Sequence, residues 1–360
     1  MTQRPIIVVE DDPFPRLLQA FLDEHPDPAR DAAIQDFVAH DIADYPAWLK
    51  SARQSAPGLY PAIVRRANSQ EELLAALPGA HAVVTESLLI GKAELAVADS
   101  LRVVQKFGTV MRNIDEVACR ERGIPVLTLR RRANMGCAEY AMGLMIMLAK
   151  KIHITRNRLS LDQLREAGFK PKLFDKRYTS NSNWARVPSM CNLHGSNLGI
   201  VGFGEIGREM ALRANAFGMN VHYTQRTRMS VEEEKHWSVQ YQGFEALLAQ
   251  SDWLCLAVPL NDQTRHLMNT RTLALMKPGA RLINISRADV VERHALLEAL
   301  SSGHLGGLGL DTFYEEPKEG EDPLTAFDQV IITQRLAAQP RFNAFTDLTQ
   351  MMSNLAKALK

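Results

Sequence analysis

Three glycines, Gly202, Gly204 and Gly207, form the feature that most constrains the fold of this chain. They follow a short apolar strand pattern at 198–201, they open a helix pattern, and their spacing is G-x-G-x-x-G. In such a unit the first glycine makes the tight turn, the second lets a pyrophosphate approach the backbone, and the third lets the helix pack closely on the strand. The helix N-terminus then offers free N–H groups and a positive dipole end to the phosphates. The pattern predicts a dinucleotide site; the alternative is a glycine-rich turn in an α/β unit that binds no ligand.

The length and charge of the chain limit its class. Its 360 residues suit two domains with substantial cores. The 42 basic and 41 acidic side chains nearly cancel, so no overall field attracts nucleic acid or an anionic membrane. The longest apolar run, residues 140–149, has about half the length that a membrane span needs. We therefore expect a protein that binds neither nucleic acid nor membrane.

The cysteines and the chain start indicate the compartment. Cys119, Cys137, Cys191 and Cys255 lie far apart and form no C-x-x-C pair. This spacing is typical of reduced thiols and predicts no zinc or other metal site. The first residues do not combine a charged segment with an apolar one, so no signal peptide is predicted. These features favour a cytoplasmic location.

Alternating apolar runs and helix patterns define the fold class. Runs at 5–9, 62–65, 82–85, 101–107 and 125–127 predict strands, with helices near 15–22 and at 69–76 between them. Ser69 is expected to cap the second of these helices, with Glu72 three residues on. Residues 25–58 are polar with scattered aromatics and are interpreted as an irregular insertion or arm. Because strands that alternate with helices form a parallel sheet covered on both faces, the predicted class is α/β with doubly wound parallel sheets.

Three further segments organise the chain. A long helix is predicted at 135–151, with methionines that fill a core rather than bind a cofactor. Residues 160–196 are polar and contain several Pro, Ser and Asn, which suits a crossing between domains. After the glycine turn and its domain, we expect a last strand at 330–332 and a terminal helix at 345–359 that returns to the first domain.

Several segments resemble the D-isomer-specific 2-hydroxyacid dehydrogenase family, and together they cover most of the chain. Residues 251–260 look like the family's strand that ends in Val-Pro-Leu. Residues 276–287 look like the segment that ends in its catalytic arginine, and residues 308–317 like the segment that carries its catalytic glutamate. Residues 107–115 and 122–125 are similar to its substrate domain. The chain resembles the glyoxylate/hydroxypyruvate reductase branch in particular.

The resemblance implies an architecture and a reaction. Two Rossmann-like domains with a cleft between them are expected. The substrate domain would comprise residues 1–155 and 338–360, and the dinucleotide-binding domain residues 156–337. A homodimer built around the dinucleotide-binding domain is also implied. The implied reaction is hydride transfer between a nicotinamide cofactor and a small 2-oxo or 2-hydroxy acid.

The resemblance assigns the substrate contacts. Arg287 would grip the substrate carboxylate and carbonyl together, because a planar guanidinium can bind both. Backbone N–H groups of the loop Gly108, Thr109 and Val110 would receive the carboxylate. This loop departs from the family's usual Gly-Val-Gly, and Arg112 stands where an acidic residue is usual. Together with the arginines at 130–132, the loop indicates either a site for a bulky anionic substrate or solvated arginines on a surface.

The catalytic pair departs from the family pattern. In the family, the glutamate that matches Glu316 pairs with a histidine that donates a proton. The family's Thr-Pro-His aligns with residues 333–335, so Arg335 occupies the histidine position. A guanidinium keeps its proton near neutral pH, so Arg335 can stabilise charge but cannot shuttle protons. Three interpretations follow: another residue or water donates the proton, the substrate needs less acid assistance, or catalysis is lost and the fold acts as a nucleotide-dependent sensor or interaction protein.

The residues after the second strand of the dinucleotide-binding unit predict which nicotinamide cofactor the chain prefers. Gln225 stands where NAD enzymes carry an acidic residue, and Arg226, Thr227 and Arg228 follow it. A neutral residue followed by arginines suits a 2′-phosphate, which predicts NADP in preference to NAD; the alternative is that Arg226 only stacks on adenine. By motif, the remaining cofactor contacts are Glu205 and Ile206 at the pyrophosphate, Val258 and Pro259 at the adenosine and ribose, Ile285 and Ser286 beside Arg287, and Asp311 at the nicotinamide amide.

Overall fold

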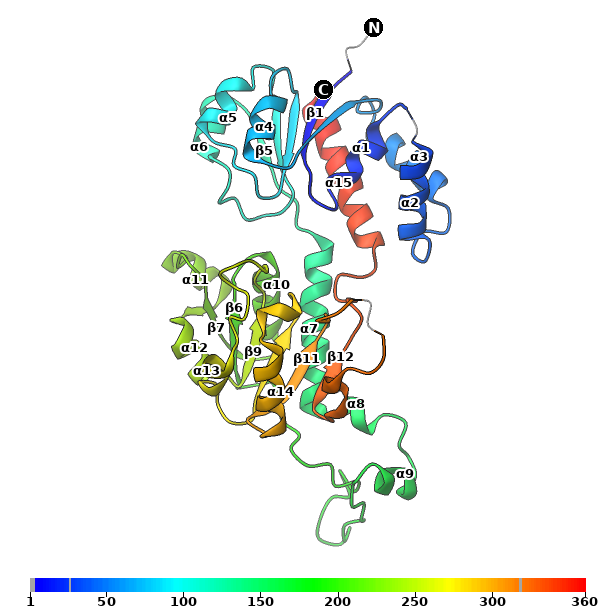
Figure 1. The fold of residues 1–360 in the computed structure, drawn as a ribbon, viewed down its shortest axis with the longest axis vertical. Helices are drawn as coiled ribbons and strands as arrows, with labels where there is room; N and C mark the ends of the chain where they lie inside the picture. Colours follow the sequence, from blue (N-terminus) through cyan, green and yellow to red (C-terminus); the bar gives the residue numbers. More distant parts are fainter. Residues whose placement is uncertain (1–3, 26, 317–318) are drawn as a thin grey trace. The chain divides into compact units, whose positions relative to one another are not determined.

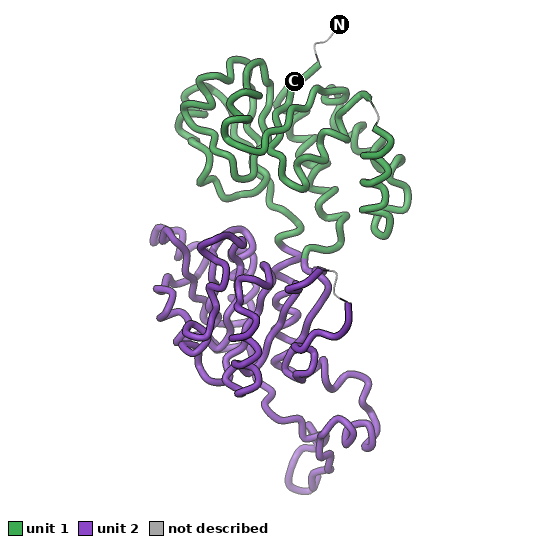
Figure 2. The backbone as a smooth tube through the Cα atoms, viewed as in Figure 1, with its two compact units in different colours: residues 1–134, 338–360 green, residues 135–337 purple. Residues whose placement is uncertain are grey.

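The computed structural model describes residues 4–25, 27–316 and 319–360. Residues 1–3 of the chain start and Pro317, which ends the predicted 308–317 segment, lie outside the described residues. Two compact units are present: residues 1–134 with 338–360 (unit 1, green in Figure 2) and residues 135–337 (unit 2, purple). Each unit has its own parallel sheet, with helices packed on it (Figure 1). The predicted class of two Rossmann-like α/β domains is confirmed.

The sheet of unit 1 has the strand order β2-β1-β3-β4-β5. Ile7 and Val9 belong to one core cluster and Val8 to another, because neighbouring residues of a strand point to opposite faces. Both faces of the sheet are therefore covered, which is why its strands read as apolar runs. The strands are β1 (Ile6–Glu10), β2 (Ile63–Ala67), β3 (Ala82–Thr85), β4 (Val103–Lys106) and β5 (Val126–Leu127). The helices are α1 (Leu17–Leu22), α2 (Pro28–Val38), α3 (Tyr45–Gln54), α4 (Gln70–Ala76), α5 (Lys92–Val97), α6 (Glu116–Glu121) and α15 (Phe342–Ala358).

Residues 25–58 are not irregular, and that interpretation was wrong. They form α2 and α3, each of which begins at an aspartate and has a proline in its first turn. Asp27 accepts two backbone N–H groups of α2 at 3.1 Å, and Asp44 accepts one of α3 at 2.9 Å. An aspartate cap followed by proline is a standard start signal for a helix. The two helices are therefore encoded locally, by Asp27 with Pro28 and by Asp44 with Pro46.

Two local predictions for unit 1 are confirmed. Ser69 caps α4, since its hydroxyl accepts the N–H of Glu72 at 3.2 Å. The terminal helix α15 returns to unit 1, where Phe345 is fully buried. The ring of Phe345 lies 4.9 Å from that of Trp48 and 5.6 Å from that of Phe21. Trp48, one of the aromatics of residues 25–58, therefore packs on the core of unit 1.

The sheet of unit 2 has the strand order β12-β11-β10-β9-β6-β7-β8, again all parallel. The direction of strand addition reverses between β6 and β9, which is where doubly wound sheets bind ligands. The strands are β6 (Asn197–Val201), β7 (Asn220–Thr224), β8 (Gln240–Tyr241), β9 (Trp253–Leu256), β10 (Ala280–Asn284), β11 (Leu305–Leu310) and β12 (Val330–Ile332). The helices are α7 (Arg132–Lys150), α8 (Ile152–Thr155), α9 (Leu161–Glu166), α10 (Glu205–Ala216), α11 (Val231–Trp237), α12 (Phe244–Gln250), α13 (Thr270–Ala274) and α14 (Arg293–Ser301), with 3-10 turns η1 (Ala288–Val290) and η2 (Pro323–Ala326).

The unit boundary lies earlier than the predicted boundary at residue 155. The division follows Asn134, in the first turn of α7, so nearly all of this helix belongs to unit 2. Met142 and Met145 of α7 are buried in the same cluster as Ile200 of β6. The methionines thus fill a core, as predicted, but it is the core of unit 2.

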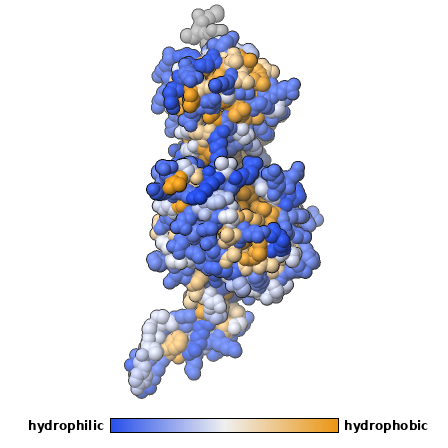
Figure 3. Space-filling model, turned by 90° about the vertical axis from the view of Figure 1, so that its left-hand side faces the viewer, coloured by the Kyte–Doolittle hydropathy of each residue, from blue (hydrophilic) through white to orange (hydrophobic). Residues whose placement is uncertain are grey.

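Residues 160–196 do not cross between the units, because they begin and end within unit 2. Residues 156–192, which we call the arm, carry α9 and extend away from the sheet of that unit (Figure 1). Leu159, Leu173 and Tyr178 of the arm expose 85%, 65% and 80% of their surface. Figure 3 shows apolar atoms, in orange, on this segment. Within the described ranges, no helix is both long and apolar enough to span a membrane.

Candidate dinucleotide and substrate site

The three glycines of the predicted turn have different surroundings. Gly202 has φ +92°, and a Cβ there would lie 2.5 Å from the carbonyl oxygen of Ala257, so the turn excludes a side chain. A Cβ on Gly207 would lie 2.5 Å from the carbonyl oxygen of Gly202, because α10 packs directly on the turn. A Cβ on Gly204 would meet nothing within 4 Å. Two glycines are thus required by the fold, whereas Gly204 leaves open space where α10 begins.

The segment after β7 carries the residues predicted to choose the cofactor. Arg226 is exposed, and no hydrogen bond or ion pair joins it to the described part of the chain. The guanidinium of Arg228 instead forms a bidentate ion pair with Glu234 of α11, with N–O distances of 2.8 and 2.9 Å. Tyr223 also donates its hydroxyl hydrogen to Glu234, at 2.9 Å. The hydrogen bond from Arg228 lowers the pKa of Glu234, burial raises it, and the hydrogen bond from Tyr223 lowers it further. The net effect is a lowered pKa of Glu234.

The segment after β10 is ordered by a residue that the sequence reading did not select. Asn284 is fully buried, and its side-chain oxygen accepts the N–H and the hydroxyl of Ser286 at 3.0 and 2.7 Å. Its amide donates to the carbonyl of Arg287 at 2.9 Å. The Arg287 side chain is exposed and donates to the carbonyl of Ser286 at 2.8 Å. Asn284 therefore fixes the backbone from which Ser286 and Arg287 project.

Asp311 follows β11 and is buried, and both of its oxygens accept hydrogen bonds from the segment after β12. Its partners are the hydroxyl of Thr333 at 2.7 Å and the backbone N–H groups of Leu336 and Ala337 at 2.9 and 2.7 Å. These contacts hold residues 333–337 against the end of β11. The predicted contact of Asp311 with a nicotinamide amide stays a prediction. In the structure, the Asp311 carboxylate has a structural role, because it binds the segment after β12.

Glu316 and Arg335 lie together, as the sequence alignment implies. The Nη1 atom of Arg335 is 2.7 Å from Oε2 of Glu316, and the N–H of Phe313 donates to Oε1 at 3.0 Å. Burial alone would raise the pKa of Glu316, but the Phe313 N–H, Arg335 and Thr312 together outweigh it and lower that pKa. Arg335 has φ +57°, a left-handed backbone conformation. The two side chains therefore form an ion pair, in which the lowered pKa of Glu316 favours its carboxylate form.

Unit 1 contains the loop predicted to bind the substrate carboxylate. Gly108, Thr109 and Val110 follow β4, and the N–H of Leu129 donates to the carbonyl of Gly108 at 2.9 Å. Gly108 has φ +147°, which favours glycine at the start of the loop. Two of the nearby arginines face carboxylates: Arg131 lies 3.6 Å from Glu86, and Arg132 lies 2.6 Å from buried Asp347.

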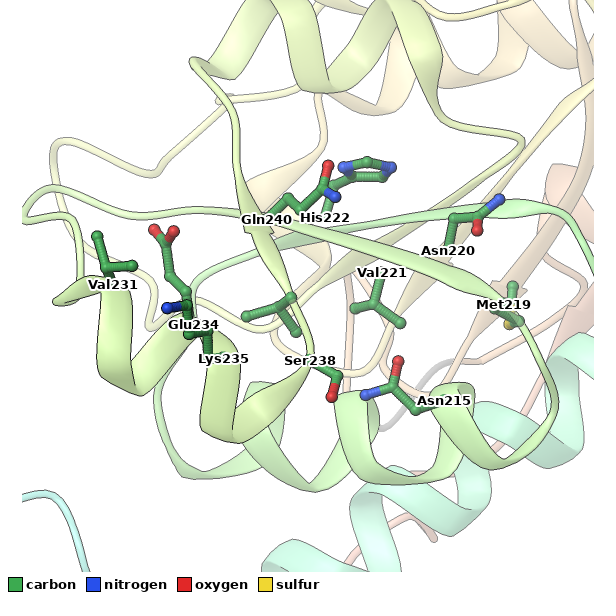
Figure 4. A pocket seen from close by; sticks show the side chains of 11 residues that line it. Asn215, Met219, Asn220, Val221, His222, Val231, Glu234, Lys235, Ser238 and Gln240 are labelled. Atoms are coloured by element: carbon green, nitrogen blue, oxygen red, sulfur yellow. The ribbon is translucent and has the colours of Figure 1, made fainter.

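A pocket of about 440 Å³ lies elsewhere in unit 2, among α10, β7, α11 and β8 (Figure 4). Asn215, His222 and Lys235 are among its lining residues. None of the three glycines and none of the predicted residues after β9, β10, β11 or β12 lines it. This pocket is therefore separate from the predicted cofactor residues, although Glu234 lines it and also holds Arg228.

Comparison with known proteins decides the family. Residues 142–337, more than half of the chain, match the profile described as "D-isomer specific 2-hydroxyacid dehydrogenase, NAD binding domain". The chain belongs to the D-isomer specific 2-hydroxyacid dehydrogenase family. A glyoxylate reductase from Pyrococcus furiosus is 34% identical over 278 residues, which cover 75% of this chain and 76% of the relative. A hydroxypyruvate reductase from Thermotoga maritima is 32% identical over 272 residues, which cover 75% of this chain and 81% of the relative.

A solved structure agrees in fold. The apo form of D-mandelate dehydrogenase from Rhodotorula graminis matches with a TM-score of 0.58 and 21% identity, over 98% of this chain and 93% of that chain. The predicted membership of the D-2-hydroxyacid dehydrogenase family is confirmed, and with it the class of oxidoreductase.

A nicotinamide dinucleotide is the cofactor that this family implies, and the residues after β6 fit it. The open space beside Gly204 adjoins the first turn of α10, whose N–H groups are the kind that bind phosphate. Glu205 and Ile206 are the first two residues of that helix. Val258 and Pro259 follow β9, next to the Gly202 turn, and a Cβ on Gly202 would lie 2.7 Å from the side chain of Val258. Among the described residues, no group of three or more His, Cys, Asp or Glu is arranged to hold a metal ion.

Proposed function

We propose that this protein is an NADPH-dependent reductase of small 2-oxo acids. Unit 2 is the dinucleotide-binding domain and unit 1 the substrate domain in this proposal. The observation that carries it is the arrangement in unit 2, where every predicted cofactor and catalytic residue follows the carboxyl end of a parallel strand. Relatives named glyoxylate reductase and hydroxypyruvate reductase support the same reaction.

In this proposal the side chains of the protein bind the substrate and stabilise the negative charge on its carboxylate and carbonyl oxygens. The bound cofactor supplies the hydride, which protein side chains cannot provide. Arg287 binds the substrate carboxylate and polarises the carbonyl, with its backbone fixed through Asn284. The N–H groups of Thr109 and Val110 receive the carboxylate. Arg335 adds positive charge but keeps its proton, so the proton must come from another group.

The preference for NADP rests on Arg226. Its guanidinium is exposed on the segment after β7, and Gln225 nearby carries no negative charge that would repel a 2′-phosphate. Arg228 contributes less in this proposal, because two of its N–H groups are already donated to Glu234. A carboxylate at position 225, which suits a ribose hydroxyl, is absent.

The test is a spectrophotometric assay of NADPH oxidation against a panel of 2-oxo acids that includes glyoxylate, hydroxypyruvate and pyruvate. We expect turnover with at least one acid and its loss in Arg287→Gln. Arg265→Gln, an exposed arginine on the segment that leads to α13, is the matched control for loss of one positive charge. Oxidation that is equally fast in wild type and Arg287→Gln would refute the assignment of Arg287.

A second candidate is a nucleotide-dependent sensor or interaction protein. Arg335 in the place of the family's histidine is the observation that favours it. The two candidates differ in one measurement, because a sensor binds NADPH in a calorimetric titration but oxidises none of it with any acid of the panel.

The proposal includes a cytoplasmic homodimer that involves the arm. Exposed apolar side chains such as Leu159 and Tyr178 are costly in water and suit burial against a second copy. The four cysteines are free thiols, which suits a reducing compartment. Sedimentation velocity on the purified protein tests the dimer.

A further inference from the structure

We propose that Glu86 donates the proton that reduces the 2-oxo group to a hydroxyl, in the role that histidine plays elsewhere in the family. This inference rests on the proposed function, because it needs a 2-oxo acid whose carboxylate lies on the loop 108–110. It answers the question that Arg335 leaves open, since a guanidinium keeps its proton.

The sheet of unit 1 places Glu86 beside that loop. Thr85, the last residue of β3, is paired in register with Lys106, the last residue of β4. Glu86 and Phe107 come next on the two neighbouring strands, which run about 4.8 Å apart. The N–H of Phe107 donates to the carbonyl of Thr85 at 2.8 Å, and the Lys106 ammonium donates to the carbonyl of Glu86. Gly108, where the loop begins, follows directly.

A buried carboxylate holds the backbone that carries Glu86. Glu10, at the end of β1, accepts the N–H of Glu86 at 2.6 Å and that of Ser87 at 2.8 Å. It also accepts the hydroxyl of Thr85 at 2.9 Å. Because the carboxylate oxygens of Glu10 accept these hydrogen bonds, Glu10 is a positioning residue and not a proton donor. Its contacts fix the direction in which Glu86 leaves the sheet.

The Glu86 side chain itself is oriented by Arg131. The guanidinium Nη2 lies 3.6 Å from Oε1 of Glu86, and the same guanidinium lies over the ring of Phe107, 4.9 Å from its centre. Arg131 therefore holds the carboxyl group close to the start of the loop. In a 2-oxo acid the carbonyl carbon is bonded to the carboxylate carbon. A group beside the carboxylate site is thus near the oxygen that must be protonated.

Burial of Glu86 favours the protonated form of its carboxyl group. Burial raises the pKa of Glu86, Arg131 and Lys106 lower it, and Glu10 and Asp12 raise it, with a net rise. A carboxyl group whose pKa moves toward neutrality is a better acid catalyst at working pH. Its side chain remains 32% exposed, so that water can restore the proton after each turnover.

The proposed step balances. As hydride adds to the carbonyl carbon, the π electron pair of the C=O bond moves to oxygen. That oxygen takes the proton of the Glu86 carboxyl, so an O–H bond of Glu86 breaks and the O–H bond of the product forms. Glu86 is left as a carboxylate beside the product carboxylate, and their repulsion favours product release. Solvent then protonates Glu86.

The test is the pH dependence of glyoxylate reduction by NADPH for wild type, Glu86→Gln and Glu86→Asp. We expect Glu86→Gln to lower kcat by about 10²–10⁴-fold, the usual contribution of a positioned acid, with KM changed less than about threefold. The wild-type fall in kcat at high pH, where Glu86 loses its proton, should disappear. Glu86→Asp should keep that fall with a smaller kcat. Glu71→Gln, an exposed glutamate on α4, is the matched control and should match wild type.

Each other result has a defined meaning. Wild-type kcat in Glu86→Gln overturns the inference alone and leaves the proposed function standing. A lower KM with unchanged kcat also overturns it, because Glu86 would then only repel the substrate. A fall in kcat that leaves the pH profile unchanged, or that accompanies a lower melting temperature, indicates a structural role and overturns it too. A wild-type protein that binds NADPH but reduces no acid of the panel overturns the proposed function as well.

Discussion

Replacing Arg226 by glutamine should separate the two cofactors. A guanidinium that meets a phosphate makes charge-assisted hydrogen bonds worth about 1.5–3 kcal/mol each when shielded from water. Arg226 is exposed, so the interaction is partly screened, and about 1.4–2.8 kcal/mol in total is a reasonable magnitude. Since about 1.4 kcal/mol is a factor of ten, affinity for a 2′-phosphate should fall about 10–100-fold. No ion pair within the described part of the chain is broken by this change, so the fold should be unaffected.

The assay is a calorimetric titration with adenosine 2′,5′-bisphosphate and with 5′-AMP, which differ only in the 2′-phosphate. Arg226→Gln should weaken the bisphosphate alone, and the difference should shrink as salt rises, because a surface charge pair is screened. Arg271→Gln, an exposed arginine of α13, controls for loss of one positive charge from unit 2. If Arg226→Gln weakens both nucleotides equally, the guanidinium stacks on adenine and the reasoning for NADP is refuted.

The remaining predictions concern the catalytic pair, the glycine turn and pH. In the Glu86→Gln background, Arg335→His should raise kcat by about tenfold or more, because an imidazole held by the Glu316 carboxylate can release a proton near pH 7; a lower kcat in the steady-state assay would show that the arginine has its own role. Gly204→Ala should keep the wild-type melting temperature and lose NADPH binding, because its added Cβ meets no protein atom within 4 Å. Gly207→Ala should lower the melting temperature, because its added Cβ would lie 2.5 Å from the Gly202 carbonyl oxygen. Equal melting temperatures of the two variants would contradict this reasoning. Asp252→Asn should cost at most about 1 kcal/mol of unfolding free energy at pH 7, because the 39% exposed side chain is partly screened by water. Burial raises the pKa of Asp252, but hydrogen bonds from the Asn197 N–H and from Lys277 outweigh it and lower that pKa in the folded state. A group with a lowered folded pKa stabilises the protein above its unfolded pKa of about 3.9. The difference in urea denaturation should therefore shrink as pH falls below about 4 and vanish once pH has passed through the lower folded-state pKa, and a difference independent of pH would refute the cause.

The sequence predicted well where the strands of unit 2 end, for a physical reason. Parallel strands put all their carboxyl ends at one edge, so residues far apart in the chain, such as Gly202 and Asp311, can be assigned to one edge from local patterns alone. The starts of helices α2 and α3 are also predictable from local sequence, because Asp27 and Asp44 are each followed by a proline in the first turn.

Other features could not be predicted from local sequence, because they depend on how distant segments pack in the fold. Nothing local indicates that Arg228 is bound by Glu234, because the pairing depends on how α11 packs beside β7. The hydrogen bonds from Leu336 and Ala337 to Asp311 also depend on the fold, because they join the segments that follow β11 and β12. The boundary at Asn134 depends on which sheet α7 packs against, and its apolar pattern suits either.

The retention of Glu316 beside Arg335 is consistent with proton transfer from unit 1. Without a cationic partner, the Glu316 carboxylate would keep two donors among the described residues, the Phe313 N–H and the Thr312 hydroxyl. Arg335 adds a charged donor and, with Asp311, fixes the segment 333–337. Because the pKa of Glu316 is lowered in this pair, neither member exchanges a proton near neutral pH. The pair therefore supplies fixed charge and a fixed backbone, which leaves the release of the proton to Glu86 in the proposal above.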